Sequence, residues 1–308
     1  LQQYDKALPY LKEYKGKKGK WSNTDFYQLG YTYYKQNDFE NAISQFNKII
    51  DGKDHVAQNG YYHLGESYLK TDKKQQALNA FKNASEMDFD KKIQEDAHLN
   101  YAKLSYEIGN SYQSVPDVLS SFLAKYPNTS SKAEIETLLI NSYITSKNYK
   151  DALVLLEKNN SAENKPAYQK VTFYRGLELY TDGNYKEALA MFKKSIATPR
   201  DAKFTARATF WKGESEYVLS NFSEALLSFK QFENAAEAKS TPEYKNINYN
   251  IAYSHFKLKE YDQAGDFFQK QIDAVKDDKV RTNDSYLRLG DSRFVTSKYW
   301  PAMDAYNK

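Results

Sequence analysis

The sequence predicts an all-α fold, a solenoid of about eight helical hairpins. Three observations support this prediction. Apolar residues recur at helical spacing, and one position in each first helix is usually small. A second, almost always small position follows 12 residues later, or 13 in the third unit. The pair returns every 35 to 39 residues. A repeat of this period indicates stacked helical units that bury a continuous core between neighbours.

The two recurring positions, here called the first and second anchors, define the register of every unit. A small residue lets two helix backbones approach, and a large apolar residue four positions after the second anchor fills the space beside them. The first anchors are Gly30, Gly65, Ala102, Ile140, Gly176, Gly213, Ala252 and Gly290. The second anchors are Ala42, Ala77, Val115, Ala152, Ala188, Ala225, Ala264 and Ala302.

In chain order, the first element is a helical stripe of Tyr4, Ala7, Leu8 and Leu11, interpreted as the second helix of a cut repeat within residues 1–20. Both ends of the chain fall inside second-helix patterns and the first residue is not Met, so we expect a fragment of a longer protein. Residues 1–308 are then interpreted as one solenoid. Its repeats are expected near 23–51, 56–86, 92–126, 132–158, 168–197, 202–237, 243–274 and 283–308, the last of them incomplete.

Breaker residues support these borders. Pro116 falls in the first turn of a second helix, where its missing N–H costs little, and Pro127 ends that helix. Pro242 opens the seventh repeat. The segment 159–166, NNSAENKP, is the most loop-like interior stretch, and a hinge, if there is one, is expected there.

The pattern resembles the tetratricopeptide repeat. That family favours Leu, Gly and Tyr in its first helix and Ala, an aromatic residue and Ala in its second, as in Leu64, Gly65, Tyr68, Ala77 and Phe81. The resemblance covers nearly the whole chain and implies a right-handed superhelical solenoid that serves as a non-catalytic scaffold for proteins. Some units depart from the pattern, and the departures include Ile140, Glu216, His255 and Phe232.

Composition excludes several classes of site. The chain has no cysteine, which removes disulfides, zinc fingers and thiol catalysis. No apolar run approaches the roughly 20 residues that span a membrane. The net charge is only +4, and the 44 basic residues include just 6 Arg against 40 acidic residues. Because nucleic-acid readers rely on Arg, this balance favours a solvated surface over a nucleic-acid face.

The sequence contains no recognisable catalytic set. The four histidines, His55, His63, His98 and His255, lie in separate units without a metal-binding spacing such as HExxH, and no GxSxG motif occurs. We therefore expect no enzyme activity, no metal and no cofactor in these residues.

Aromatic residues recur at the positions of the first helices that are not needed for packing within the hairpins. In stacked hairpins the first helices line the concave face, and the positions three before, one after and four after the first anchor are expected to face it. Tyrosine offers a large contact area and loses little conformational entropy on binding, because its side chain has few rotatable bonds. These rings therefore predict a groove for an extended or helical peptide. The rings are Tyr27, Tyr31, Tyr34, Tyr62, Tyr106, Phe173, Tyr180, Phe210, Tyr217, Tyr249, Tyr253 and Phe256.

Several alternatives stay open. The same rings could pack against neighbouring repeats and bind nothing. They could stack the bases of single-stranded RNA, with Lys neutralising phosphates. The array could also serve self-association, because apolar helix faces lie at both ends. The family's charged clamp for a chaperone carboxylate is not expected, since Tyr27 and Tyr31 occupy the corresponding positions.

The style of the sequence is similar to long repeat proteins of the bacterial cell envelope. That similarity implies a role in assembling an envelope complex. It also favours a periplasmic or outer-membrane-associated location over a cytoplasmic one.

Overall fold

The computed structural model describes residues 3–49, 51–159 and 161–308. Within these residues the chain forms 17 α-helices and no strand beyond one isolated bridge between Lys17 and Lys20, which confirms the all-α prediction. The helices form two compact units, which divide between Ser146 and Lys147. No helix of the described residues is both long and apolar enough to cross a membrane.

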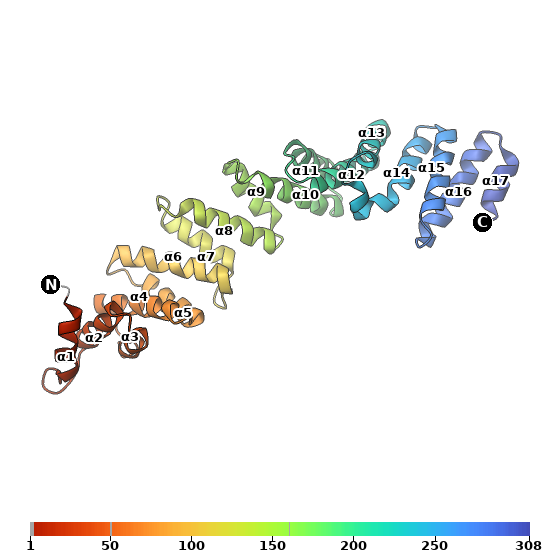
Figure 1. Ribbon diagram of the computed structural model, residues 1–308. Helices are drawn as coiled ribbons and strands as arrows, with labels where there is room; N and C mark the ends of the chain where they lie inside the picture. Colours follow the sequence, from red (N-terminus) through yellow and green to blue (C-terminus); the bar gives the residue numbers. More distant parts are fainter. Residues whose placement is uncertain (1–2, 50, 160) are drawn as a thin grey trace. The chain divides into compact units, whose positions relative to one another are not determined.

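The first unit is a series of antiparallel helical hairpins (Figure 1). Each helix packs on its neighbours in sequence, and successive first helices also touch, α2 with α4, α4 with α6 and α6 with α8. The bounds are α1 (Tyr4–Glu13), α2 (Asn23–Lys35), α3 (Phe39–Phe46), α4 (His55–Lys70), α5 (Lys74–Glu86), α6 (Lys91–Ile108), α7 (Val115–Lys125) and α8 (Lys132–Thr145).

The second unit repeats this arrangement with one interruption, two short 3₁₀ turns between α13 and α14. Here α10 touches α12, and α14 touches α16. The bounds are α9 (Tyr149–Lys158), α10 (Lys165–Thr181), α11 (Tyr185–Ala197), α12 (Ala202–Val218), α13 (Phe222–Glu233), η1 (Ala238–Ser240), η2 (Pro242–Asn246), α14 (Ile247–Lys257), α15 (Tyr261–Ala274), α16 (Lys279–Val295) and α17 (Tyr299–Tyr306).

The anchors do the packing that their spacing implies. At Gly65 a Cβ atom would lie 2.8 Å from the ring of Phe81, so only glycine lets that ring sit against the first helix. Phe81 itself has no exposed surface, and neither has Ala77 on the same helix. The same pairing of a first-anchor glycine with a buried ring occurs at Gly30, Gly176 and Gly213. These four hairpins are therefore closed by a glycine on one helix and a phenyl ring on the other.

In every turn between a first and a second helix except the α6–α7 turn, a left-handed residue lies two positions before the second helix. This conformation reverses the chain after the first helix has ended. Glycine supplies it at Gly183, with φ near 79°, and Gly109, with φ near 80°, supplies it directly after α6 in the longer α6–α7 turn. Elsewhere non-glycine residues adopt it, namely Asn37, Asp72, Lys147, Ser220, Lys259 and Ser297.

Two buried glutamines each tie a hairpin to the loop that follows it. The side chain of Gln58 donates to the carbonyl oxygen of Met87 at 2.8 Å and accepts from the N–H of Asp90 at 2.7 Å. Gln169 plays the same part in the second unit and accepts from Arg200 and Asp201 at 2.9 and 2.8 Å. These contacts satisfy loop backbone groups that packing removes from water.

The expected hinge at residues 159–166 includes Asn160, which lies outside the described residues. Helix α10 begins within that segment, at Lys165, and the two compact units divide earlier, between Ser146 and Lys147. The hinge stays a prediction.

Candidate functional site

Two of the expected groove rings belong to the core. Phe173 has no exposed surface and Phe210 has 4%. The position three before the first anchor lies over the buried ring of the second helix, so Phe173 contacts Phe192 at 6.2 Å between centroids and Phe210 contacts Phe229 at 5.6 Å. Tyrosine at this position carries a hydroxyl that reaches outward, whereas phenylalanine ends within the core. The expectation that Phe173 faces a partner is therefore wrong. Phe210 is also largely buried and exposes only a small part of its ring, in a hollow described below.

The rings of the first unit converge on a histidine. Tyr27, Tyr31, Tyr34 and Tyr62 lie 5.0 to 5.9 Å from the imidazole of His63, all edge to face. Burial lowers the pKa of His63 to about 4, so the imidazole is neutral at neutral pH. These rings largely fill one another's space, which favours the packing interpretation for this unit.

The remaining expected rings are partly accessible to solvent. Tyr106 on α6 is 38% exposed. Tyr217, Tyr249 and Tyr253 are half-buried and lie around a hollow in the second unit, and Phe256 packs beside Tyr253 with centroids 6.5 Å apart. Tyr180 is also half-buried and donates a hydrogen bond to Glu214 in the wall of that hollow. The hollow is the strongest candidate for a binding site.

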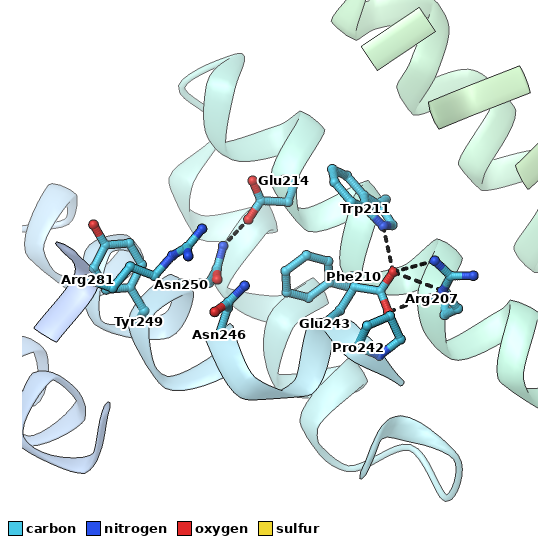
Figure 2. A pocket seen from close by; sticks show the side chains of 10 residues that line it. All are labelled: Arg207, Phe210, Trp211, Glu214, Pro242, Glu243, Asn246, Tyr249, Asn250 and Arg281. Carbon is cyan, nitrogen blue, oxygen red and sulfur yellow. Dashed lines mark hydrogen bonds and ion pairs between the residues drawn. The ribbon is translucent and has the colours of Figure 1, made fainter. Parts of the chain in front are cut away.

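That hollow, here called the α12–α14 cleft, has a volume of about 440 Å³ (Figure 2). Its walls come from α12, η2, α14 and the start of α16. A cleft of this size between rigid helices, with aromatic surface and a few convergent polar groups, has the character of a ligand site. It is lined by Arg207, Phe210, Trp211, Glu214, Pro242, Glu243, Asn246, Tyr249, Asn250 and Arg281.

One end of the cleft is built on a buried carboxylate. Glu243 is 6% exposed and accepts hydrogen bonds from Nε of Arg207 at 2.9 Å and Nε1 of Trp211 at 3.0 Å. Figure 2 shows the side chains of Arg207 and Trp211 converging on this carboxylate. A buried charge needs such partners, and this group fixes the indole and the guanidinium at the cleft wall.

Glu214 stands at the middle of the cleft with neutral partners. Its carboxylate accepts from the hydroxyl of Tyr180 at 3.2 Å and from the side-chain amide of Asn250. Burial raises the pKa of Glu214 above its ordinary value, and the two hydrogen bonds only partly oppose that shift. Among the described residues no Lys, Arg or His forms an ion pair with it.

A second recess, about 240 Å³, adjoins the cleft and shares Glu214 as a wall. Tyr217, Tyr249 and Tyr253 surround it, with Tyr249 and Tyr253 in contact at 4.8 Å between ring centroids. The hydroxyls of these two rings donate to Asp284 at 2.9 and 2.5 Å. Their orientation is therefore held by the next repeat.

The expected partner-binding residues were Tyr and Phe alone, so they left out the other residues of this cleft. Arg207 and Trp211 lie six and two positions before the anchor Gly213, and Asn246 and Asn250 lie at the same two positions before the anchor Ala252. These positions share a helix face with the position one after the anchor. These four residues could have been predicted from the sequence, because counting six and two residues back from the anchors Gly213 and Ala252 selects all of them.

The cleft contains no arrangement that suggests catalysis. In the described ranges, no group of three or more His, Cys, Asp or Glu side chains lies close enough to hold a metal ion. Its carboxylates are occupied by hydrogen bonds to Tyr, Asn, Trp and Arg side chains. The chemistry on offer is hydrogen bonding, ion pairing and aromatic contact.

Comparisons with known proteins match family models to three stretches of the chain. Residues 1–84 match the family model described as anaphase-promoting complex, cyclosome, subunit 3. Residues 173–237 and 246–275 each match a model described as tetratricopeptide repeat. A search of curated proteins found no match.

Solved structures share the fold at low sequence identity. The complex of Naa15 and Naa10 bound to HypK-THB is 14% identical, with a TM-score of 0.51, over 99% of this chain and 47% of that one. The TPR2AB domain of yeast Sti1 in complex with pHSP90 is 16% identical over 91% of this chain and 98% of that one, with a TM-score of 0.40. The C-terminal part of a TPR repeat-containing protein from Cytophaga hutchinsonii is 14% identical over 84% and 98%, with a TM-score of 0.45.

Proposed function

Because this chain belongs to the tetratricopeptide repeat superfamily, whose folds are generally scaffolds for protein–protein interaction, we propose that it holds an extended peptide segment of a partner protein in the α12–α14 cleft. The scaffold is non-catalytic, and the cleft is the recognition surface. The choice of the α12–α14 cleft as the binding site, and of an extended peptide as its ligand, rests on side chains of the second unit.

The observation that carries the proposal is an unsatisfied acceptor in the cleft. The side-chain oxygen of Asn246 is shielded from solvent and accepts no hydrogen bond from the protein. Leaving a buried acceptor unpaired costs about 1–3 kcal/mol, and an incoming donor recovers it. Asn250 lies one helical turn further along the same wall. Two amides at this spacing suit the alternating N–H and C=O groups of an extended peptide.

The charges of the cleft favour a peptide over RNA. Arg207 is paired with Glu243 and Arg281 with Asp278, at 2.9 and 2.5 Å. Paired guanidiniums leave little net positive potential for a phosphate backbone, on which RNA affinity depends. They remain suited to a peptide, whose groups are mostly neutral.

A displayed library of random peptides, selected on the purified protein, tests the proposal. We expect enriched peptides that bind the wild-type chain, measured by fluorescence polarisation of synthetic copies. Replacing both Asn246 and Asn250 by Ala should weaken that binding about tenfold or more, because two amide contacts are lost.

The matched control is Asn234→Ala, an exposed asparagine that ends α13 away from the cleft lining. It should leave the affinity unchanged. Peptides whose binding ignores the double variant, or a library that yields no binder, would contradict the proposal. Salt-sensitive micromolar binding of a mixed RNA pool would favour the RNA alternative instead.

We also propose a periplasmic or outer-membrane-associated location, with a role in assembling a bacterial envelope complex. The support is the similarity in sequence style to long repeat proteins of the envelope. Fractionation of cells that express the full-length protein tests this directly, with export as the expected outcome and retention in the cytoplasm as the contrary one.

A further inference from the structure

Glu214 differs from the other acidic groups around it. Glu243, Asp278 and Asp284 each lie within 4 Å of an arginine, at 2.9, 2.5 and 3.7 Å. Among the described residues, Glu214 has hydrogen bonds from a tyrosine and an asparagine but no cation at that distance. The nearest cationic influence is Arg281, whose guanidinium is bonded to Asp278 and lies 5.9 Å from the ring centre of Tyr249.

The space beside this carboxylate is shaped for a side chain. The recess of about 240 Å³ is smaller than the pockets that take whole drug-sized ligands. Three tyrosine rings and Asn250 line it together with Glu214. The negative faces of aromatic rings attract cations, most strongly where water is excluded.

We propose that this recess binds the basic side chain of a lysine in the partner peptide, with the ammonium group on Glu214 and the alkyl stem against Tyr217, Tyr249 and Tyr253. The inference rests on the proposed peptide-binding function, because the lysine enters from a chain lying in the adjoining cleft. The inference specifies the class of partner: a peptide segment with a basic residue at a fixed position.

The energetics favour this occupant over a neutral one. Removing a carboxylate from water is costly unless an opposite charge approaches it. Burial raises the pKa of Glu214, and the hydrogen bonds from Tyr180 and Asn250 and the charge of Arg281 only partly oppose that shift. A lysine brings the missing charge and up to three N–H donors, whereas a neutral side chain of the same length leaves the cost of burial in place.

The first test uses a small probe that does not require peptide binding. Nα-acetyl-lysine N-methylamide and its norleucine counterpart differ only in the charged amine. We expect the lysine probe to shift the nuclear magnetic resonance signals of the Tyr217 and Tyr253 rings and to bind about tenfold tighter than the norleucine probe. In Glu214→Gln the ratio should fall to about one.

Two further variants keep the test sharp if the glutamine variant folds poorly. Glu214→Asp retains the charge and should keep part of the preference for lysine. Glu224→Gln removes an exposed carboxylate in the first turn of α13 and should leave the ratio as in the wild-type chain. Equal binding of the two probes to the wild-type chain, or a lysine preference that survives in Glu214→Gln, overturns the inference.

The second test is the peptide selection repeated on Glu214→Gln. A fixed basic residue among peptides enriched on the wild-type chain, absent from those enriched on the variant, supports the inference. Enriched peptides without a fixed basic residue overturn it while leaving the proposed function intact. A selection without any binder contradicts the proposed function, and the probe experiment then decides the inference by itself.

Discussion

The ring of Phe192 occupies the space that a side chain at Gly176 would need. A Cβ atom at Gly176 would lie 2.6 Å from Cε1 of that ring, well inside van der Waals contact. The ring is fully buried, so it has little room to withdraw. This single contact joins α10 to α11 and shows why the first anchor of the repeat is glycine here.

Gly176→Ala is accordingly expected to destabilise the protein by about 1–3 kcal/mol through overpacking. Gly265→Ala is the matched control, since it also lies inside a helix but its nearest neighbours would be 3.6 Å away, an ordinary contact. It should stabilise by about 0.5–1 kcal/mol, because alanine favours helices. Urea unfolding followed by circular dichroism measures both. A neutral Gly176→Ala would show that the ring can move aside.

The buried amide of Gln169 should be hard to replace. Gln169→Leu leaves the backbone N–H groups of Arg200 and Asp201 without their acceptor, and we expect a loss of about 2–4 kcal/mol in the free energy of unfolding. Gln231→Leu, at an exposed position of α13, is the control and should change stability by less than about 0.5 kcal/mol. Similar effects of the two substitutions would mean that water replaces the lost bonds.

The hairpin fold was predictable from residues whose role is local. Gly176 and Ala188 must be small because two helices touch there, and that constraint recurs in most of the repeats. The fold class could therefore be predicted from the spacing of the anchors. The inner turns were less visible, because Lys147 and Ser220 adopt a left-handed conformation that sequence patterns associate with glycine.

The candidate site was predictable only in part, since it depends on contacts between repeats. Tyr249 and Tyr253 were found because they occupy expected groove positions. Glu243 was not, because it lies in the irregular η2 turn, outside the repeat register, and only the structure brings it to Arg207. Phe173 was assigned to the groove because the position three before the first anchor was assumed to face the groove in every repeat. The exposure of that position depends on whether it carries tyrosine or phenylalanine.

The neutral imidazole of His63 should make stability depend on pH. Its pKa is about 4 in the folded chain and about 6.5 when unfolded, so above pH 6.5 the imidazole is neutral in both states and the full stability is present. Between pH 6.5 and 4 the unfolded chain binds a proton that the folded chain does not, and stability falls by up to about 3 kcal/mol.

Urea unfolding at several pH values isolates this contribution. His63→Gln should lose less stability than the wild-type chain as the pH falls from 6.5 to 4. His55→Gln, at an exposed position that begins α4, is the control and should follow the wild-type curve. Parallel curves for all three proteins would show that protonation of His63 costs nothing in the folded state.

The pair of Arg207 and Glu243 should behave as a buried ion pair. Arg207→Met leaves the carboxylate of Glu243 buried without its cation and is expected to cost about 3–5 kcal/mol. Combining it with Glu243→Gln removes the charge and keeps an acceptor for Trp211, so the double variant should be more stable than Arg207→Met alone. Lys298→Met, which breaks the exposed pair with Asp262, should cost less than about 1 kcal/mol. An equal loss in the single and double variants would argue against an unpaired charge as the cause.

The division of the aromatic residues into core and surface has its own test in Phe173 and Tyr106. Phe173→Ala empties a site with no exposed surface between Phe192 and Phe204, and a loss of about 3–5 kcal/mol is expected. Tyr106→Ala removes a ring that is 38% exposed, so the loss should stay below about 1 kcal/mol. Thermal unfolding of the two variants and of Phe173→Leu, which keeps much of the volume and should lie between them, gives the comparison. If Tyr106→Ala were as damaging as Phe173→Ala, partial exposure would be a poor guide to which rings are free to meet a partner, and the half-buried tyrosines of the α12–α14 cleft would have to be assigned to the core as well.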